Sequence, residues 1–262
     1  MTSLKLRLDN IIKALPSLTD SQVLWLEGVI QIFACPHKFI KYKSDLINDR
    51  VLNDFGDVLR IHHSFSLEPF TKDKFEYALE KVLAHRGINA KLAPKGNRGH
   101  DLTINHETFS LKTQADRNIN ENYIWISKFM ELGKGVWGDK DEDLIGLRKA
   151  FIDHMKNYDR ILILRALGKD PYWKYELIEV PKRVLLLAKK GKLEMMHEST
   201  QYPKPGYCFV NDPESGEEIF KLYFDGGREN KLQLKNIRKK YCKLHAYWEF
   251  NVPNAIDVKM AN

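Results

Sequence analysis

The stretch GHDLTINHETFSLK, residues 99–112, decides the fold of this chain and carries most of its candidate chemistry. Apolar and polar residues alternate on both sides of Asn105-His106, the pattern of two short strands joined by a two-residue turn. With that turn, Asp101 lies across from Ser110, and Lys112 lies on the diagonal. An acid and an amine are therefore expected on one face of a hairpin.

The same register predicts an apolar opposite face. It pairs Leu102 with Phe109 and Ile104 with Glu107, and Leu111 follows on the same side. Glu107 therefore points away from Asp101 and is the weaker candidate for a second acid.

Hydrolysis of a phosphodiester needs a hard cation, which prefers oxygen ligands. Asp101 offers a carboxylate and Leu111 a backbone carbonyl, while Lys112 is placed to position or deprotonate the attacking water and to offset phosphate charge. An Asp followed by Glu/Asp-x-Lys is the pattern of the PD-(D/E)xK nucleases, which this hairpin resembles. Ser110 departs from it, because that position is expected to carry a carboxylate.

Glu76 is the best candidate for the missing acid. It lies at the edge of the apolar arc of a helix predicted from Thr71 to Ala84, and several families of this superfamily supply an acid from that helix. Besides Ser110, two residues are accessory candidates. His100 either positions a phosphate or hydrogen-bonds locally, and Gln114 either contacts metal-bound water or is a solvated polar residue.

Composition favours a polyanionic partner. The chain has 262 residues and a formal net charge of +7, which points to nucleic acid. Its three cysteines show no CxxC spacing, so neither a disulfide framework nor a zinc site is predicted. The N-terminus lacks a signal-peptide core, and no run of about 18 apolar residues appears. We expect a cytoplasmic protein with no membrane partner.

The order of elements predicts an α/β fold: a restriction-endonuclease-like mixed sheet flanked by helices. We expect one domain over residues 1–262, with a helical N-terminal part (1–65), a catalytic core (66–190) and a β-rich C-terminal subdomain (191–262). The nearly all-apolar run 160–166 is predicted to be a central, buried strand.

Five segments in order resemble the SmaI-like family of type II restriction endonucleases: GHDLTI (99–104), LKT (111–113), MELGKG (130–135), PKPGY (203–207) and YFDGG (223–227). The likeness runs from roughly residue 20 to 253 and includes Phe75-Glu76, which supports an acidic role for Glu76. Two departures are Gln114, where Glu is expected, and an apparent insertion at 138–145.

The resemblance implies Mg²⁺-dependent cleavage of double-stranded DNA at a short G·C-rich palindrome, with CCCGGG cut at its centre as the default. It also implies a homodimer and a cognate DNA methyltransferase as functional counterpart. Arg98 and Arg228 are candidates for reading guanine, and the candidates for phosphate contacts are Lys95, Arg117, Lys128 and Lys134. Two alternatives stay open: a structure-specific nuclease of repair or recombination, and a DNA-binding protein whose catalytic site has decayed.

Overall fold

The computed structural model describes residues 3–94, 96–97, 99–116, 118–133 and 135–253. Its helices are α1 (Ser3–Ala14), α2 (Asp20–Ala34), α3 (Asp49–His63), α4 (Lys72–His85), α5 (Asp143–His154) and α6 (Lys182–Leu185). The strands of the first sheet are β1 (His37–Lys41), β2 (Ala90–Leu92), β3 (Leu102–Ile104), β4 (Glu107–Gln114), β6 (Arg160–Ala166), β7 (Tyr172–Glu179) and β12 (Lys243–Asn251). Those of the second are β5 (Tyr123–Glu131), β8 (Lys192–Met195), β9 (Gly206–Asn211), β10 (Glu218–Asp225) and β11 (Lys231–Arg238).

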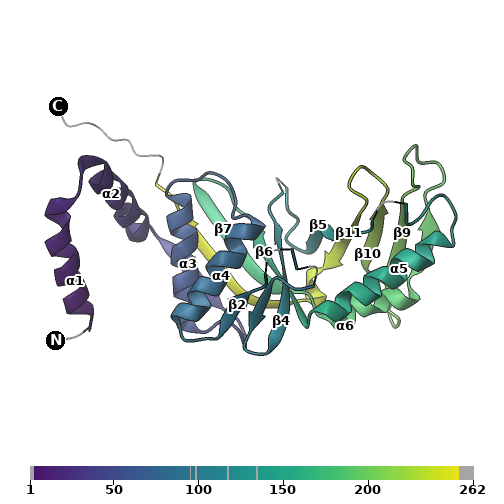
Figure 1. Ribbon diagram of the computed structural model, residues 1–262, viewed down its shortest axis with the longest axis horizontal. Coiled ribbons are helices and arrows are strands. Elements are labelled where there is room, and N and C mark those ends of the chain that lie inside the picture. The colour runs from purple at the N-terminus through teal and green to yellow at the C-terminus, as the bar shows by residue number, and fades with distance from the viewer. Residues whose placement is uncertain (1–2, 95, 98, 117, 134, 254–262) are drawn as a thin grey trace.

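The two sheets form two lobes that lie side by side (Figure 1). The first has 7 strands in the order β1-β12-β7-β6-β4-β3-β2, and the second has 5 in the order β5-β11-β10-β9-β8. Parallel pairing of β4 with β6 makes the first sheet mixed. The predicted α/β fold with a mixed sheet flanked by helices is confirmed.

The predicted hairpin forms in the predicted register. Leu102 pairs with Phe109 and Ile104 with Glu107, which leaves a two-residue turn. Asn105 adopts a φ of +55° there, a conformation that asparagine tolerates better than most residues. The strand β6 lies fourth of the seven and is buried from its second residue onward, as its apolar sequence predicts.

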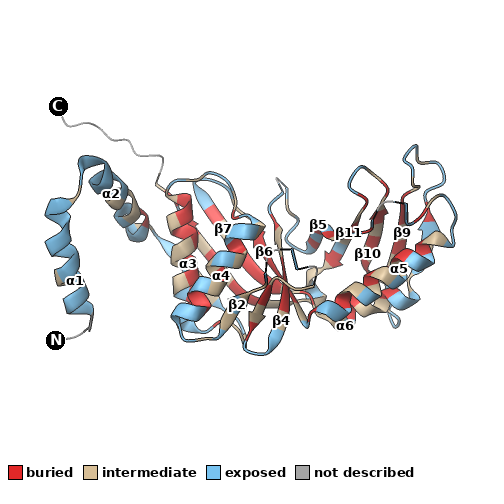
Figure 2. Ribbon diagram, in the orientation of Figure 1, coloured by how far each residue is buried: buried red, intermediate tan, exposed pale blue. Residues whose placement is uncertain are grey.

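Each face of the first sheet is covered by its own hydrophobic core. Helices α3 and α4 pack on one face and carry buried residues (Figure 2). Phe55 and Phe75 are buried there with Phe109 and Leu111 of the hairpin. The other face shares a core with α5 and the second sheet. The apolar side of the hairpin therefore packs against α3 and α4, and its polar side faces the junction of the two lobes.

Residues from the two ends of the chain complete the first sheet. The edge strand β1 pairs with β12, and β12 pairs with β7. The strand β5, from the middle of the chain, joins β11 in the second sheet.

The expected division into one domain with three parts stays a prediction. Among the described residues, no helix is long and apolar enough to cross a membrane.

The last residue of α3, His63, is a histidine buried in its neutral form. His63 Nδ1 donates to the carbonyl oxygen of Ser66 at 2.9 Å, and Nε2 lies 2.7 Å from the hydroxyl of Tyr175. The ring stacks on Trp173 with 3.7 Å between centroids. Burial lowers the pKa of His63 to about 3, because a charged ring there would lose its hydration.

This burial predicts a loss of stability in acid. The folded pKa of His63 lies below the unfolded value, so its contribution is complete above pH 6.5 and is lost as the pH falls from 6.5 toward 3. We expect the free energy of unfolding in urea to fall between pH 7.5 and pH 5, with His63 contributing up to ~2 kcal/mol. His63→Gln is less stable at pH 7.5 but shows a smaller fall, and equal falls in both proteins would contradict the assignment.

Candidate active site

Asp101 directly precedes β3, at the point where the hairpin ladder ends. Its Oδ2 accepts the backbone N–H of Leu111 at 2.6 Å and lies 3.4 Å from Ser110 Oγ. Its own N–H donates to the carbonyl oxygen of Phe109 at 2.8 Å. The carboxylate thus takes the place of a strand partner for β4 and is held there by the backbone.

Lys112 reaches back toward this carboxylate. Its Nζ donates to Ser110 Oγ at 2.9 Å and lies 3.9 Å from Asp101 Oδ2. The side chain is only 12 % exposed, and burial lowers the pKa of Lys112 to about 8, although the negative charge of Asp101 opposes the shift. Lys112 Nζ also lies 5.9 Å from the ring centroid of Phe129. Ser110 therefore connects the amine to the acid.

Glu76 joins the site through a residue that the sequence did not single out. Lys72 Nζ, one helical turn earlier on α4, lies 3.0 Å from Glu76 Oε1 and 2.9 Å from Asp101 Oδ1. Burial acts to lower the pKa of Lys72, but its bonds to Asp101 and Glu76 outweigh burial and raise it. Burial also raises the pKa of Glu76. One ammonium thus bridges both candidate acids.

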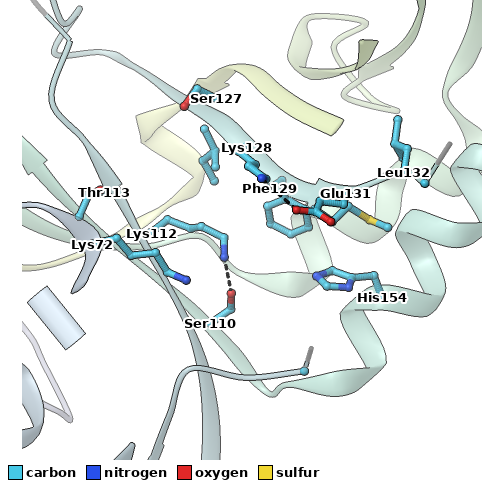
Figure 3. Close-up of a pocket in the computed structure, with 14 residues that line it drawn as sticks. Lys72, Ser110, Lys112, Thr113, Ser127, Lys128, Phe129, Glu131, Leu132 and His154 are labelled. Carbon is cyan, nitrogen blue, oxygen red and sulfur yellow. Dashed lines mark hydrogen bonds and ion pairs between the residues drawn. The ribbon is translucent and has the colours of Figure 1, made fainter. Parts of the chain in front are cut away.

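A cavity of about 840 Å³ opens in front of these groups. Lys72, Ser110 and Lys112 line one wall, and His154 of α5 lies at another (Figure 3). Burial lowers the pKa of His154, and the charge of Lys112 lowers it further. Lys72 lies four residues before Glu76 on the predicted helix, and this spacing predicts that the two side chains are close together. Nothing local in the sequence connects His154 to the hairpin.

The donor set fits a hard divalent cation. Asp101 and Glu76 offer carboxylate oxygens, and both hold the ammonium of Lys72, which shows that the place between them favours positive charge. The N–H and C=O of one strand residue point to the same side, so the carbonyl of Leu111 faces the same place as its N–H. Among the described residues, no group of three or more His, Cys, Asp or Glu side chains could hold a metal. The candidate ligands are therefore two carboxylates, from Asp101 and Glu76, and one carbonyl, from Leu111.

The three accessory candidates lie in different surroundings in the structure. Ser110 is buried beside Asp101 and Lys112, whereas His100 makes local contacts, with Nδ1 3.3 Å from Asn97 Nδ2. Gln114 is neither solvated nor in the cavity lining, because its Oε1 accepts Nε–H of Arg165 at 2.9 Å in the interior.

The candidate DNA contacts are described only in part. Lys95, Arg98, Arg117 and Lys134 lie outside the described residues. Lys128 lines the cavity and pairs with Glu131 at 3.0 Å. Arg228 is exposed in the turn between β10 and β11, near Asn230, whose carbonyl accepts the N–H of Leu132 in the cavity lining.

Comparisons with known proteins identify the family of the chain. The SmaI family, described as type II site-specific deoxyribonuclease, matches residues 11–250. The type II restriction enzyme SmaI of Serratia marcescens is 41% identical over 236 residues, which cover 89% of this chain and 92% of that protein. No solved structure matches the chain. The chain therefore belongs to the SmaI family of type II site-specific deoxyribonucleases and is a restriction endonuclease.

Proposed function

We propose that this restriction endonuclease hydrolyses double-stranded DNA at a short G·C-rich palindrome, with Mg²⁺ as its cofactor, and cuts CCCGGG at the centre to give blunt ends. One observation carries the assignment of the site: the carboxylates of Asp101 and Glu76 both lie within 3.0 Å of one ammonium, beside the buried amine of Lys112. The named relative is a type II restriction enzyme, which supports the same chemistry.

Asp101, Glu76 and the carbonyl of Leu111 are the groups that would hold the cation. When bound, Mg²⁺ neutralises charge on the scissile phosphate and makes water a better nucleophile. Lys112 is fixed by Ser110 and faces the cavity, where its amine positions the attacking water or takes its proton. Lys72 Nζ lies between the carboxylates of Asp101 and Glu76, so its ammonium would have to move aside for a cation held there, and it would then be near enough to offset charge on a phosphate oxygen.

A palindrome is read most simply by a two-fold symmetric homodimer with one active site for each strand. We also propose a cognate DNA methyltransferase as the functional counterpart and the cytoplasm as the place of action. The match to a family of type II site-specific deoxyribonucleases favours this function over a structure-specific repair nuclease or a decayed DNA-binding protein.

The role of Glu76 is tested against a neighbour on the same helix. We expect Glu76→Gln to slow cleavage of plasmid DNA by about 10²–10⁴-fold, because one of two acids that hold the cation is lost. Glu80→Gln, one turn further along α4, makes the same chemical change at a carboxylate that does not share the Lys72 ammonium with Asp101, and it is expected to cut at the normal rate. Equal rates for the two variants would remove Glu76 from the site.

Asp101→Asn and Lys112→Met are expected to abolish cleavage while they retain binding to a duplex that contains the recognition sequence. The asparagine still accepts the N–H of Leu111, so the hairpin is kept and only the charge is lost. Cleavage is measured by gel electrophoresis and binding by fluorescence anisotropy. Full cutting by either variant would refute the proposed chemistry.

The recognition sequence is tested by digestion of one plasmid of known sequence in Mg²⁺, with the ends of the fragments mapped. The expected result is discrete fragments with blunt ends in the middle of CCCGGG. Discrete ends at another palindrome would refute the specificity alone, whereas a smear, or preference for branched DNA, would refute site-specific cutting.

A further inference from the structure

The five-stranded sheet buries one face fully, and most side chains on its other face are half-buried. Ile126, Leu222 and Leu234 belong to the buried face, which packs in the core that includes α5. The other face is formed by side chains of β5, β9, β10 and β11. We call it the tyrosine–lysine face, and its members are Trp125, Tyr207, Phe209, Lys221, Tyr223, Asp225, Gln233 and Lys235.

Two lysines on this face are held over aromatic rings. Tyr207 and Tyr223 pair across β9 and β10, with ring centroids 4.9 Å apart. Lys235 Nζ lies 3.8 Å from the centroid of Tyr223, and Lys221 Nζ lies 5.7 Å from those of Tyr207 and Phe209. The rings thus fix both amines on the surface of the sheet.

The two lysines are also direct cross-strand partners. Lys221 of β10 pairs with Lys235 of β11, and like charges directly opposite each other destabilise a sheet. Lys221 Nζ lies 3.8 Å from the carboxylate of Glu218. Lys235 Nζ has no carboxylate oxygen within 4.0 Å in the part of the chain that the structure describes. An arrangement that keeps two positive charges together fits an anionic partner.

Beside the lysines lies a polar group with a fixed orientation. Gln233 Oε1 accepts the indole N–H of Trp125 at 3.2 Å, and Gln233 Nε2 donates to Asp225 Oδ2 at 2.9 Å. Asp225 Oδ1 also accepts the N–H of Gly227 at 3.0 Å. Side chains whose positions are fixed before DNA binds can distinguish one base edge from another, because binding then costs little conformational entropy.

The face leads into the active site along one strand. Ser127 lies two residues after Trp125 on β5 and lines the same cavity as Lys112. A polyanion that follows β5 across this face therefore reaches the cavity that Lys112 lines. Duplex DNA, the substrate of the enzyme, is the polyanion that fits.

We propose that the tyrosine–lysine face is the surface that binds duplex DNA in front of the active site. Lys221 and Lys235 contact phosphates, and Asp225, which the buried Gln233 holds in place, lies at base edges. The inference rests on the proposed function, because it positions the same DNA that the cavity cleaves. Phosphate contacts set affinity for any sequence, while base-edge contacts set the preference for one sequence.

The test is fluorescence anisotropy with two labelled duplexes, one containing CCCGGG and one scrambled, in Ca²⁺ in place of Mg²⁺. We expect Lys235→Gln to weaken binding to both duplexes equally and to lower the slope of log affinity against log salt by about 1. Gln233→Leu is expected to weaken binding to the CCCGGG duplex by about 10-fold or more and to leave the scrambled duplex unchanged.

Lys149→Gln is the matched control, because it removes the same charge from α5, on the covered side of the sheet, and is expected to change neither affinity. Thermal melting identifies a misfolded variant, and Lys221→Gln then replaces Lys235→Gln. Wild-type affinity and salt slope in both lysine variants would overturn the proposal, as would a loss of binding that follows only from a loss of dimer in size-exclusion chromatography. If the wild-type protein does not prefer CCCGGG, the proposed recognition sequence fails, while the salt slope still tests the face.

Discussion

The candidate active site depends on one hydrogen bond, from the backbone N–H of Leu111 to the carboxylate of Asp101. It ties the acid to the strand that carries Lys112, so the distance between acid and amine follows from the register of the hairpin. A slip of one residue would turn Lys112 to the opposite face. Burial of Leu102 and Phe109 under the helices prevents that slip, so the hydrophobic core holds the chemistry in place.

The charges of the site are balanced before any cation binds. Two carboxylates, Asp101 and Glu76, meet two amines, Lys72 and Lys112. This balance gives a physical reason for Ser110, since a third carboxylate at that buried position would leave negative charge without a partner. Ser110 instead accepts a hydrogen bond from the amine of Lys112, and its own hydroxyl donates to the carboxylate of Asp101.

Local pattern predicted the hairpin, its turn and the central strand β6, because alternation and apolar runs reflect burial directly. It missed the role of Lys72, which arises only when α4 packs beside the hairpin and brings Asp101 within reach. Gln114 shares the parity of Lys112, but Arg165 on the adjacent strand draws its side chain into the interior. The entry of β5 into a second sheet and of β12 into the first also depends on long-range pairing, which single-sequence periodicity does not encode.

The central claim is that Asp101 and its neighbours form the cation site, and titration calorimetry with Mn²⁺ in the absence of DNA tests it most directly. The account predicts that Asp101→Asn abolishes the Mn²⁺ binding of the wild-type protein. Glu107→Gln removes an acid from the other face of the same hairpin, where Glu107 pairs with Arg160, and should bind Mn²⁺ normally. Unchanged Mn²⁺ binding in Asp101→Asn would contradict the account.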